Sequence, residues 1–377
     1  MNHGPTFSFS MLIFALTCIG FLDGCLAAAL FRRKRWYLWG AAGAALTFAS
    51  EEAYSWYRLA YADTGVWGTA AGYGACAVLA AAVAAALPLA VLSVLSVFRT
   101  CRVTAQRLGA GWLCLSLLAG LYGVSLGNHP EETEKIAVTA DALPAAFEGY
   151  RVAQISDTHI GPYYHPADLE AALDAAAASG ADLTVVTGDL IDDMRYMPEA
   201  ARILEEKKGD FPDGILFIWG NHEYYRGRET VRRHLEEAGI PILENESVKI
   251  RRGGDVLFAA GVDYPWTKGA GHAAEMRAMA DQAFADIPAG AAVLFLAHHS
   301  DFIDEGFARG AALTLTGHTH AMQFGIAGRP VVSHFKYTRG MYEDGDSLGY
   351  VSRGNGGWFP FRLGCGRELA VFELHGK

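Results

Sequence analysis

Residues 311–320 read AALTLTGHTH, an apolar run that ends in a glycine followed by two histidines, His318 and His320. Short apolar runs bounded by glycine and polar residues are typical of buried β-strands. The two imidazoles therefore come directly after the carboxyl end of a predicted strand. A lone histidine in such a place is more often a hydrogen-bonded core residue than a ligand, so the interpretation of this pair depends on how the other strands end.

Four other predicted strands end in the same way. Their sequences are YRVAQIS (150–156), ADLTVVT (181–187), GILFIW (214–219) and AAVLFLA (291–297). The polar residues that follow them are, in order, Asp157 and His159, then Asp189, then Asn221 and His222, then His298. Helical patterns such as PADLEAALDAAAAS lie between the strands, and this alternation predicts an α/β fold whose sheets are covered on their faces. Ligands of such sheets bind beyond the carboxyl ends of the strands, so we expect these polar side chains to meet.

The spacing within the clusters favours this convergence. Asp157 and His159 lie two positions apart, as do His318 and His320. On an extended backbone, residues two apart point to the same side. Glycines at 188, 220 and 317 are expected to let the chain turn sharply and approach a ligand closely.

The residue types in these clusters point to metal ions. Aspartate, asparagine and histidine form a mixed nitrogen and oxygen ligand set, which suits Mn, Fe or Zn better than Ca or Mg. Cys365 is the only cysteine after residue 127, so a structural thiolate site is excluded there. The ligands outnumber those that one tetrahedral ion needs. Two divalent ions about 3.5–4 Å apart, bridged by one carboxylate, would use them all.

The distribution of charge divides the chain into two halves. Residues 1–127 hold eight Lys or Arg and four Asp or Glu, a net charge of +4. The whole chain carries −10, which leaves −14 for residues 128–377, where twelve of the thirteen histidines lie. Nucleic acid attracts basic surfaces, so no nucleic acid is expected as a partner of this acidic half. A small phosphate ligand held through a metal ion is compatible with it.

Four apolar segments dominate the first half. They cover roughly residues 7–31, 36–50, 66–98 and 108–126. A membrane-spanning helix needs about 20 apolar residues, and the second segment is shorter than that. However, the basic loops RRKR (32–35) and RTCRVTAQR (99–107) both belong in the cytoplasm by the positive-inside rule. Both can lie there only if two spans separate them, so four spans are predicted.

This topology predicts an integral protein of the cell (inner) membrane whose second half lies outside the cytoplasm. The predicted organisation is a transmembrane region of about four helices over residues 1–127, a linker over 128–149 and a catalytic domain over 150–377. Asp23 lies inside the first span. We expect it to pack between helices beside a polar neighbour.

The motifs as a set resemble those of the calcineurin-like metallophosphoesterases. They are SDTHIG, GDLID, GNHEYY, LAHHSDF and GHTHAMQ, and they extend from about residue 150 to residue 323. The tail GYVSRGNGGWFPFRLGCGRELAVFEL is similar to the closing strands of the bacterial membrane-associated branch with N-terminal transmembrane helices. The resemblance implies a two-sheet β-sandwich flanked by helices and a metal-dependent phosphoric ester hydrolase. It does not cover the four spans.

The resemblance also implies roles for single residues. His222 is placed beside the scissile phosphate, where it stabilises charge or protonates the leaving oxygen. The implied metal ligands are Asp157, His159 and His320 for one ion, Asn221, His298 and His318 for the other, and Asp189 as the bridge between both.

Two motifs differ from the usual pattern of the family, and one aspartate has two possible roles. The fourth motif of the family usually reads His-x-Pro, and here it is His298-His299-Ser300. Its register makes His298 the ligand and His299 a neighbour of the ligands or a substrate residue. The branch usually has Gly-Gly after the last histidine, where this chain has Ala321-Met322, which affects the local backbone and the pocket shape. Asp192 either orients a ligand or caps the following helix.

The leading functional hypothesis is a membrane-anchored dinuclear phosphohydrolase that cleaves phosphodiester or phosphomonoester bonds. A lipid-linked substrate is expected because anchoring raises the effective concentration of membrane substrates. One alternative is a non-catalytic metal-binding sensor domain on a membrane stem, and another is a transporter with an accessory domain. Some bacterial members of the branch cleave UDP-diacylglucosamine, which is cytoplasmic. That pyrophosphatase-like activity is the alternative if the domain faces the cytoplasm.

Overall fold

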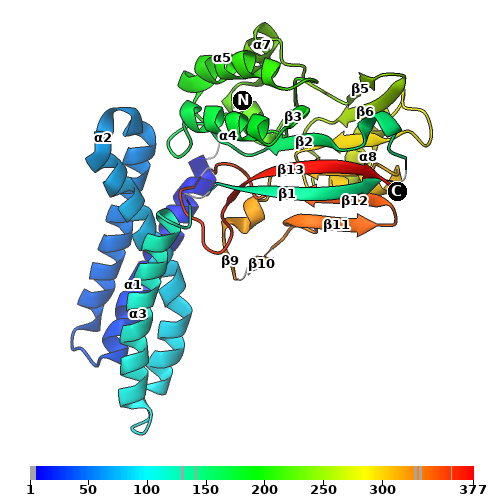
Figure 1. Cartoon of the computed structure of the whole chain (residues 1–377). Coiled ribbons are helices and arrows are strands. Elements are labelled where there is room, and N and C mark those ends of the chain that lie inside the picture. The colour runs from blue at the N-terminus through cyan, green and yellow to red at the C-terminus, as the bar shows by residue number, and fades with distance from the viewer. Residues whose placement is uncertain (1–5, 129–130, 141, 327–328, 331–332, 358) are drawn as a thin grey trace. The chain divides into compact units, whose positions relative to one another are not determined.

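The computed structural model describes residues 6–128, 131–140, 142–326, 329–330, 333–357 and 359–377. The chain divides into two units (Figure 1). The first, residues 1–128 together with 360–363, is built from helices, and the second, residues 129–359 together with 364–377, contains the sheets.

Two mixed sheets form the second unit. The first has the order β1-β13-β2-β3-β4 and consists of β1 (Glu131–Ala140), β2 (Tyr150–Ile155), β3 (Leu183–Val186), β4 (Ile215–Phe217) and β13 (Arg367–Gly376). The second has the order β11-β12-β8-β7-β6-β5 and consists of β5 (Glu246–Arg252), β6 (Asp255–Gly261), β7 (Val293–Leu296), β8 (Leu313–Thr316), β11 (Gly340–Asp344) and β12 (Ser347–Val351). A short pair, β9 (Gly325–Ile326) and β10 (Arg329–Pro330), follows β8.

The strands that precede the polar clusters run parallel within each sheet. This holds for β2, β3 and β4 and for β6, β7 and β8. The carboxyl ends of parallel strands lie at the same edge of a sheet. The loops that carry the clusters therefore start from one edge of each sheet.

Apolar side chains hold four layers together. Between the sheets, Val152 and Val185 share one core with Leu294 and Leu313. The helices α4 (Pro166–Ala178), α5 (Met197–Lys207) and α7 (Arg228–Glu237) cover the outer face of the first sheet through a second core (Figure 1). The helices α8 (His272–Ala283) and α9 (Phe302–Ala308) supply the third core, which covers the second sheet. The predicted α/β fold, a two-sheet sandwich flanked by helices, is confirmed.

The sequence predicts a linker over residues 128–149, and part of this segment is a strand. Residues 131–140 form β1, which pairs in parallel with β13 along its whole length. The register places Glu131 opposite Arg367 and Ala140 opposite Gly376. The first strand of the unit therefore lies beside its last strand.

The helical unit contains α1 (Thr6–Leu30), α2 (Trp36–Leu95) and α3 (Arg102–Val124). The backbone of α2 is non-helical at Gly65, with φ 57° and ψ −165°. Gly72 packs against the ring of Tyr57. Fifteen residues of straight helix would separate these two by about 22 Å, so the chain reverses at Gly65 and α2 supplies two antiparallel segments. The four apolar segments of the sequence thus correspond to four helical segments.

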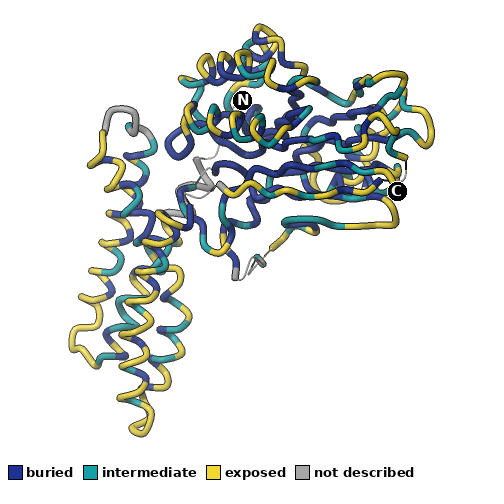
Figure 2. Tube along the Cα trace, viewed as in Figure 1, coloured by how far each residue is buried: buried dark blue, intermediate teal, exposed yellow. Residues whose placement is uncertain are grey.

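Two of the helical segments are long and apolar enough to cross a membrane, Gly65–Leu95 and Arg102–Val124. The apolar stretch of α1, Phe14–Leu30, is shorter. The segment 36–64 contains two glutamates, an aspartate and an arginine. These two remain predicted spans. The outward faces of the helices are largely exposed (Figure 2) and carry large apolar side chains such as Leu87 and Leu118. Exposed apolar surface of this kind marks contact with a membrane or a partner.

The packing of Asp23 beside a polar neighbour stays a prediction. The side chain is half-buried in α1, and its Oδ1 atom has no hydrogen-bond partner in the part of the chain that the structure describes.

Glycines bring α1 close to the first segment of α2. A Cβ atom at Gly24 would lie 2.0 Å from the carbonyl oxygen of Trp39, and one at Gly43 would lie 2.0 Å from the carbonyl oxygen of Gly20. Small residues at such contacts let membrane helices approach closely. Gly111 in α3 differs, because nothing lies within 4 Å of a Cβ built there.

We predict that Gly24→Ala destabilises the helical unit, whereas Gly111→Ala does not. The added methyl group at position 24 meets backbone atoms that cannot move aside, and overpacking of this kind costs about 1–3 kcal/mol. At position 111 the same methyl group meets open space and favours the helix by about 1 kcal/mol. Thermal unfolding of the two variants in detergent, beside the wild type, measures the difference. Equal midpoints for the two variants would contradict the packing described above.

Candidate metal centre

The structure brings six of the seven predicted metal ligands together in two groups. In the first group, His320 Nε2 lies 3.1 Å from His159 Nε2 and 3.3 Å from Asp157 Oδ1. In the second group, His298 Nε2 lies 3.2 Å from Asp189 Oδ2, and 3.3 Å from His318 Nδ1. The Oδ2 atom of Asp189 also lies 3.6 Å from His159 Nε2, so this carboxylate reaches both groups.

These donor atoms fit divalent cations. The carboxylates and most of the imidazoles are buried, and within each group their nitrogen and oxygen donor atoms lie within 4.8 Å of one another. Asn221 begins the helix α6 (Asn221–Arg226) after β4, is 7% exposed, and its amide oxygen has no hydrogen-bond partner among the described residues. A buried amide oxygen without a partner costs free energy unless something binds it. A cation would satisfy this oxygen and separate the facing nitrogens.

The backbone explains why the ligands converge, and the reason differs from the one that the sequence suggests. Five of the predicted ligands have positive φ values, between 48° and 70°: Asp157, His159, Asp189, His318 and His320. They therefore do not continue the extended strands, and the two-residue alternation of a strand does not set their directions. Each left-handed residue other than glycine costs about 1–2 kcal/mol. Such strain persists only where the surrounding structure holds it, and it clusters at functional sites.

The glycines of the clusters allow close approach, as the sequence predicts. A Cβ atom at Gly220 would lie 2.2 Å from Asp189 Oδ1, and one at Gly317 would lie 2.3 Å from Asp157 Oδ2. At Gly188 a Cβ atom would lie 2.7 Å from His298 Nδ1, and this glycine also has a positive φ of 86°, which the other two do not have. No larger residue fits at these positions without moving a predicted ligand.

Asp192 binds one histidine of the site and lies close to a second, whose Nδ1 has no hydrogen-bond partner among the described residues. His222 Nδ1 donates a hydrogen bond of 2.5 Å to Asp192 Oδ1, and His159 Nδ1 lies 3.5 Å from Asp192 Oδ2. The cap of the following helical turn is Asp193, which accepts from the Arg195 backbone N–H. Of the two roles that the sequence leaves open for Asp192, the structure thus supports the orienting one.

Charges inside the site oppose the effect of burial. Burial lowers the pKa of His222, but Asp189 and Asp192 outweigh it and raise that pKa to about 9. Burial likewise disfavours the charged form of His298, yet Asp189 and Asp157 raise its pKa to about 10. For Asp189 itself, burial favours the neutral form, but His298 and His222 hold its pKa well below the usual range. Asp189 is thus stabilised as a carboxylate.

The structure separates His298 from His299. His298 is fully buried in the second group, where its Nδ1 donates to the Thr187 carbonyl oxygen at 2.7 Å. The ring of His299 lies 5.1 Å from that of His318, between centroids, but it turns toward His272 and Asp301. His299 therefore borders the site without joining either ligand group.

Ala321 and Met322 adopt the backbone that glycines would favour. Their φ values are 50° and 59°. The turn that Gly-Gly forms in the branch is therefore left-handed here as well, and Ala321 and Met322 adopt it at a conformational cost that glycine does not have.

One buried residue that the sequence analysis leaves without a role is Glu223. Its carboxylate accepts hydrogen bonds from the backbone N–H groups of Asp189 (3.0 Å), Leu190 (2.7 Å) and Gly220 (2.9 Å). It thereby ties the loop after β3 to the loop after β4. The signal for this role is present in GNHE, because a glutamate three residues after the start of a helix forms one half of a capping box. Tyr264, which lies 3.5 Å from His318 Nε2 through its hydroxyl, carries no comparable signal.

We predict that Glu223→Gln weakens both the fold and the metal affinity. A glutamine presents one amide N–H₂ group to backbone donors, so at least one buried N–H loses its acceptor, at a cost of about 1–3 kcal/mol. Misplacing Asp189 should lower metal affinity by about 10- to 100-fold. Chemical unfolding and a metal titration measure the two effects, with the exposed Glu229→Gln as the control. Wild-type values in both assays would show that Glu223 does not hold the two loops.

Known proteins resemble this chain over the unit that contains the site. The family model for calcineurin-like phosphoesterases matches residues 150–322. The uncharacterized metallophosphoesterase YkuE of Bacillus subtilis is 28% identical, over 68% of this chain and 90% of YkuE. An uncharacterized metallophosphoesterase of Aquifex aeolicus is 28% identical, over 70% of this chain and 98% of its own.

A eukaryotic relative carries the same domain in a membrane protein. It is a transmembrane protein with metallophosphoesterase domain from Danio rerio, 25% identical over 70% of this chain and 61% of its own length. Together with the clustered histidines and aspartates, these matches identify the second unit. Residues 150–322 form a calcineurin-like phosphoesterase domain, and the chain is a metal-dependent phosphoric ester hydrolase.

Proposed function

We propose that this protein is a membrane-anchored phosphohydrolase that works with two divalent metal ions. The observation that carries the proposal is the position of the Asp189 carboxylate within 3.6 Å of an imidazole from each ligand group. One ion would be held by Asp157, His159 and His320, the other by Asn221, His298 and His318, with Asp189 shared. The mixed nitrogen and oxygen donors favour Mn, Fe or Zn.

Two such ions supply a nucleophile from bound water near neutral pH and neutralise charge on the phosphoryl oxygens. The residues of the chain fix how the site uses this chemistry. The hydrogen bond from His298 Nδ1 to the Thr187 carbonyl leaves His298 Nε2 free to face the centre. His159 Nε2 also faces the centre, 3.1 Å from His320 Nε2, while its Nδ1 lies 3.5 Å from Asp192 Oδ2 and makes no hydrogen bond among the described residues. Outer partners such as the Thr187 carbonyl fix the tautomer and direction of ligating imidazoles.

His222 is the proposed acid. Its Nδ1 is bound to Asp192, so its Nε2 faces Asp189 at 3.9 Å and is available to a substrate oxygen. Asp192 is not among the proposed ligands, so its negative charge remains available to keep the imidazole protonated. A protonated His222 can donate to the phosphoryl oxygens as charge builds, or protonate the departing oxygen.

The proposed substrates are phosphodiesters or phosphomonoesters, and lipid-linked esters are the favoured class. Support comes from the apolar helices, because anchoring raises the effective concentration of a membrane substrate. A non-catalytic sensor would not need His222 and Asp192 poised beside the ligand groups, so the hydrolase is preferred.

We predict that His222→Ala keeps both metal ions and loses most of the turnover. Removing one donor to a transition state costs about 10²–10³ in rate. Metal-reconstituted full-length protein would be assayed against monoester, diester and lipid-phosphate panels, and its metal content measured by elemental analysis. His234→Ala, in α7, serves as the control.

Two outcomes would overturn parts of this proposal. Loss of metal from His222→Ala would make His222 a ligand rather than an acid. If fully active wild-type protein reproducibly contains one equivalent of metal, the proposal of a dinuclear centre is wrong.

The orientation of the protein is also a proposal, and it decides which substrates the site can reach. The basic loops at 32–35 and 99–107 support a cytoplasmic position for both, which puts the catalytic unit outside the cytoplasm if all four helical segments cross the inner membrane. The weak point is the segment 36–64, whose apolar part is short. If it does not cross, the site can face the cytoplasm, where nucleotide-linked lipids such as UDP-diacylglucosamine occur.

We predict that a reporter active only outside the cytoplasm gives signal when fused after Lys377. The same reporter inserted at Thr100, in the second basic loop, should be silent, and a reporter active only inside should show the reverse pattern. Signal at Lys377 from the inside reporter alone would contradict the orientation and favour the cytoplasmic substrate class.

A further inference from the structure

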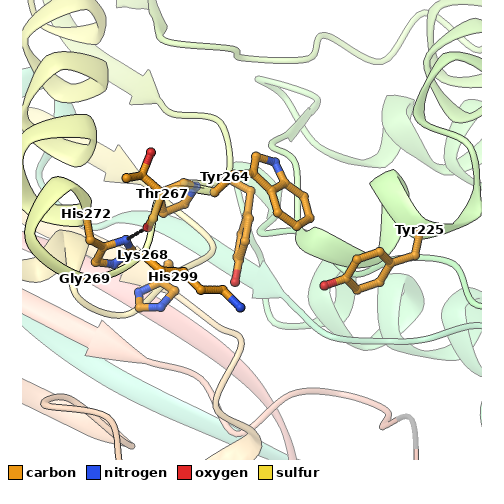
Figure 3. Close-up of a pocket in the computed structure, with 9 residues that line it drawn as sticks. Tyr225, Tyr264, Thr267, Lys268, Gly269, His272 and His299 are labelled. Carbon is orange, nitrogen blue, oxygen red and sulfur yellow. Dashed lines mark hydrogen bonds between the residues drawn. The ribbon is translucent and has the colours of Figure 1, made fainter. Parts of the chain in front are cut away.

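A cavity of about 400 Å³ lies beside the metal centre and is lined by residues that are not among the proposed ligands. Most of them come from the segment between β6 and α8, which no sequence motif singles out. Figure 3 shows the lining residues Tyr225, Tyr264, Lys268, His272 and His299 around this space. A volume of this size accommodates a small-molecule group of one or two rings.

The cavity borders the reacting end of the site. The Tyr264 ring lies 5.5 Å from the His318 ring, and its hydroxyl lies 3.5 Å from His318 Nε2. On the other side, the Tyr225 ring lies 5.6 Å from the ring of His222. A phosphate ester held at the centre would therefore have one of its groups in the cavity. Because the proposed acid His222 contacts this wall, the group that departs with a proton from His222 departs into the cavity.

One wall of the cavity consists of aromatic rings centred on Trp266. Its ring packs edge-to-face with Tyr264 at 4.9 Å, with Tyr224 at 5.0 Å and with Tyr225 at 5.8 Å. Trp266 is 41% exposed and Tyr225 is 61% exposed, so both rings are accessible to a ligand.

This aromatic wall is held in place by its neighbours. The Tyr224 hydroxyl donates a hydrogen bond of 2.5 Å to Asp263, and the guanidinium of Arg228 lies 4.9 Å from the Tyr224 ring centre. A rigid, exposed aromatic face binds a second ring at low entropic cost.

The opposite wall is polar. His272 Nδ1 donates to the Thr267 carbonyl oxygen at 2.8 Å (Figure 3), so its Nε2 is left as an acceptor in the neutral ring. The His299 side chain is largely buried beside the same space, and its ring lies 5.1 Å from that of His272. Lys268 extends toward the Tyr264 hydroxyl in Figure 3 and is the one cation among the lining residues. This wall offers hydrogen bonds to hydroxyl or carbonyl substituents and does not suit an acyl chain.

We propose that this cavity binds the leaving group of the substrate, and that this group contains a planar ring with hydrogen-bonding substituents stacked against Trp266. The inference rests on the proposed hydrolase function and narrows its substrate class. In the reaction, water adds to phosphorus and the phosphorus–oxygen bond to the ring-bearing alcohol breaks. The proton of His222 passes to the departing oxygen, and the proton released from the attacking water restores the protonated His222. The lipid or other retained group stays on the phosphate.

Two matched diesters test the proposal on metal-reconstituted, full-length protein. Methyl 2-(4-hydroxyphenyl)ethyl phosphate and methyl hexyl phosphate both release a primary alcohol, so their intrinsic reactivities are similar. Wild-type protein should show a kcat/KM about tenfold higher for the ring-bearing ester, which is the size of one aromatic contact. Trp266→Ala should reduce the ratio to about one, and Trp266→Phe, which keeps a ring, should retain most of it.

Several results would overturn the proposal. An equal loss of kcat/KM for both esters in Trp266→Ala would make the effect structural. Equal kcat/KM values for the two esters in the wild type would show that the cavity does not prefer a ring. Release of methanol instead of the ring-bearing alcohol would show that the ring belongs to the part of the substrate that stays on the phosphate.

Failure of the hydrolase proposal is distinguishable from failure of the cavity proposal. If wild-type protein cleaves neither ester nor any ester of the wider panels, the hydrolase proposal fails. Calorimetric binding of the ring-bearing ester would then decide about the cavity. Binding to wild type that is weakened about tenfold in Trp266→Ala supports the cavity as a ring site, and equal binding to both proteins refutes it.

Discussion

A single buried carboxylate, that of Glu223, determines the spacing of the loops on which the site depends. It accepts backbone N–H groups from the end of β3 and from the end of β4, and no solvent reaches it. Buried backbone donors need a partner, so these loops cannot separate without losing hydrogen bonds that water cannot replace. Crowding at Gly220 reinforces this constraint, because only a glycine lets the second loop pass beside Asp189. Asp189 is therefore fixed between two sets of imidazoles by contacts that involve neither set.

The same constraint accounts for the strain in the ligand backbone. Asp157, His159 and Asp189 all have left-handed conformations, which an isolated loop would not keep. They are held by hydrogen bonds between loops, such as those from the His159 N–H to the Asp189 carbonyl oxygen and from the Asp157 N–H to the Gly188 carbonyl oxygen. The packed sandwich beneath supplies the free energy that offsets this strain. A rigid arrangement of this kind brings like groups close together before any cation binds, and bound cations stabilise the folded state in return.

The helical unit depends on a different physical rule. Its segments come together at glycines, since apolar side chains gain little by leaving one apolar environment for another. The catalytic unit, by contrast, is held by buried apolar cores that exclude water. The difference explains why half of the chain exposes large apolar residues while the other half buries them. It also makes a membrane the environment in which the helical unit is expected to be stable.

Much of the molecule was determined by the sequence alone. Apolar runs bounded by glycine, alternating with helical patterns, predict the strands, the helices and the covered sheets, because the spacing of apolar residues is a local property of the chain. The identities of the clustered residues specify metal chemistry for the same reason, since ligand type does not depend on the fold. Other features were decided only by the tertiary structure. The pairing of β1 with β13 joins segments more than 200 residues apart, and no local pattern records it.

The same holds for the site and its surroundings. The convergence of Asp157 with His159 arises from left-handed backbone that other loops impose, although the sequence suggested an extended one. The role of Asp192 was open until Asp193 proved to be the cap. The aromatic cavity at Trp266 has no signature in the sequence, because its rings come from the helix that contains Tyr225 and from the segment after β6, which meet only in the folded chain. The types of residue in each cluster can be read from the sequence, whereas the distances between loops are set only when the sheets pack against each other.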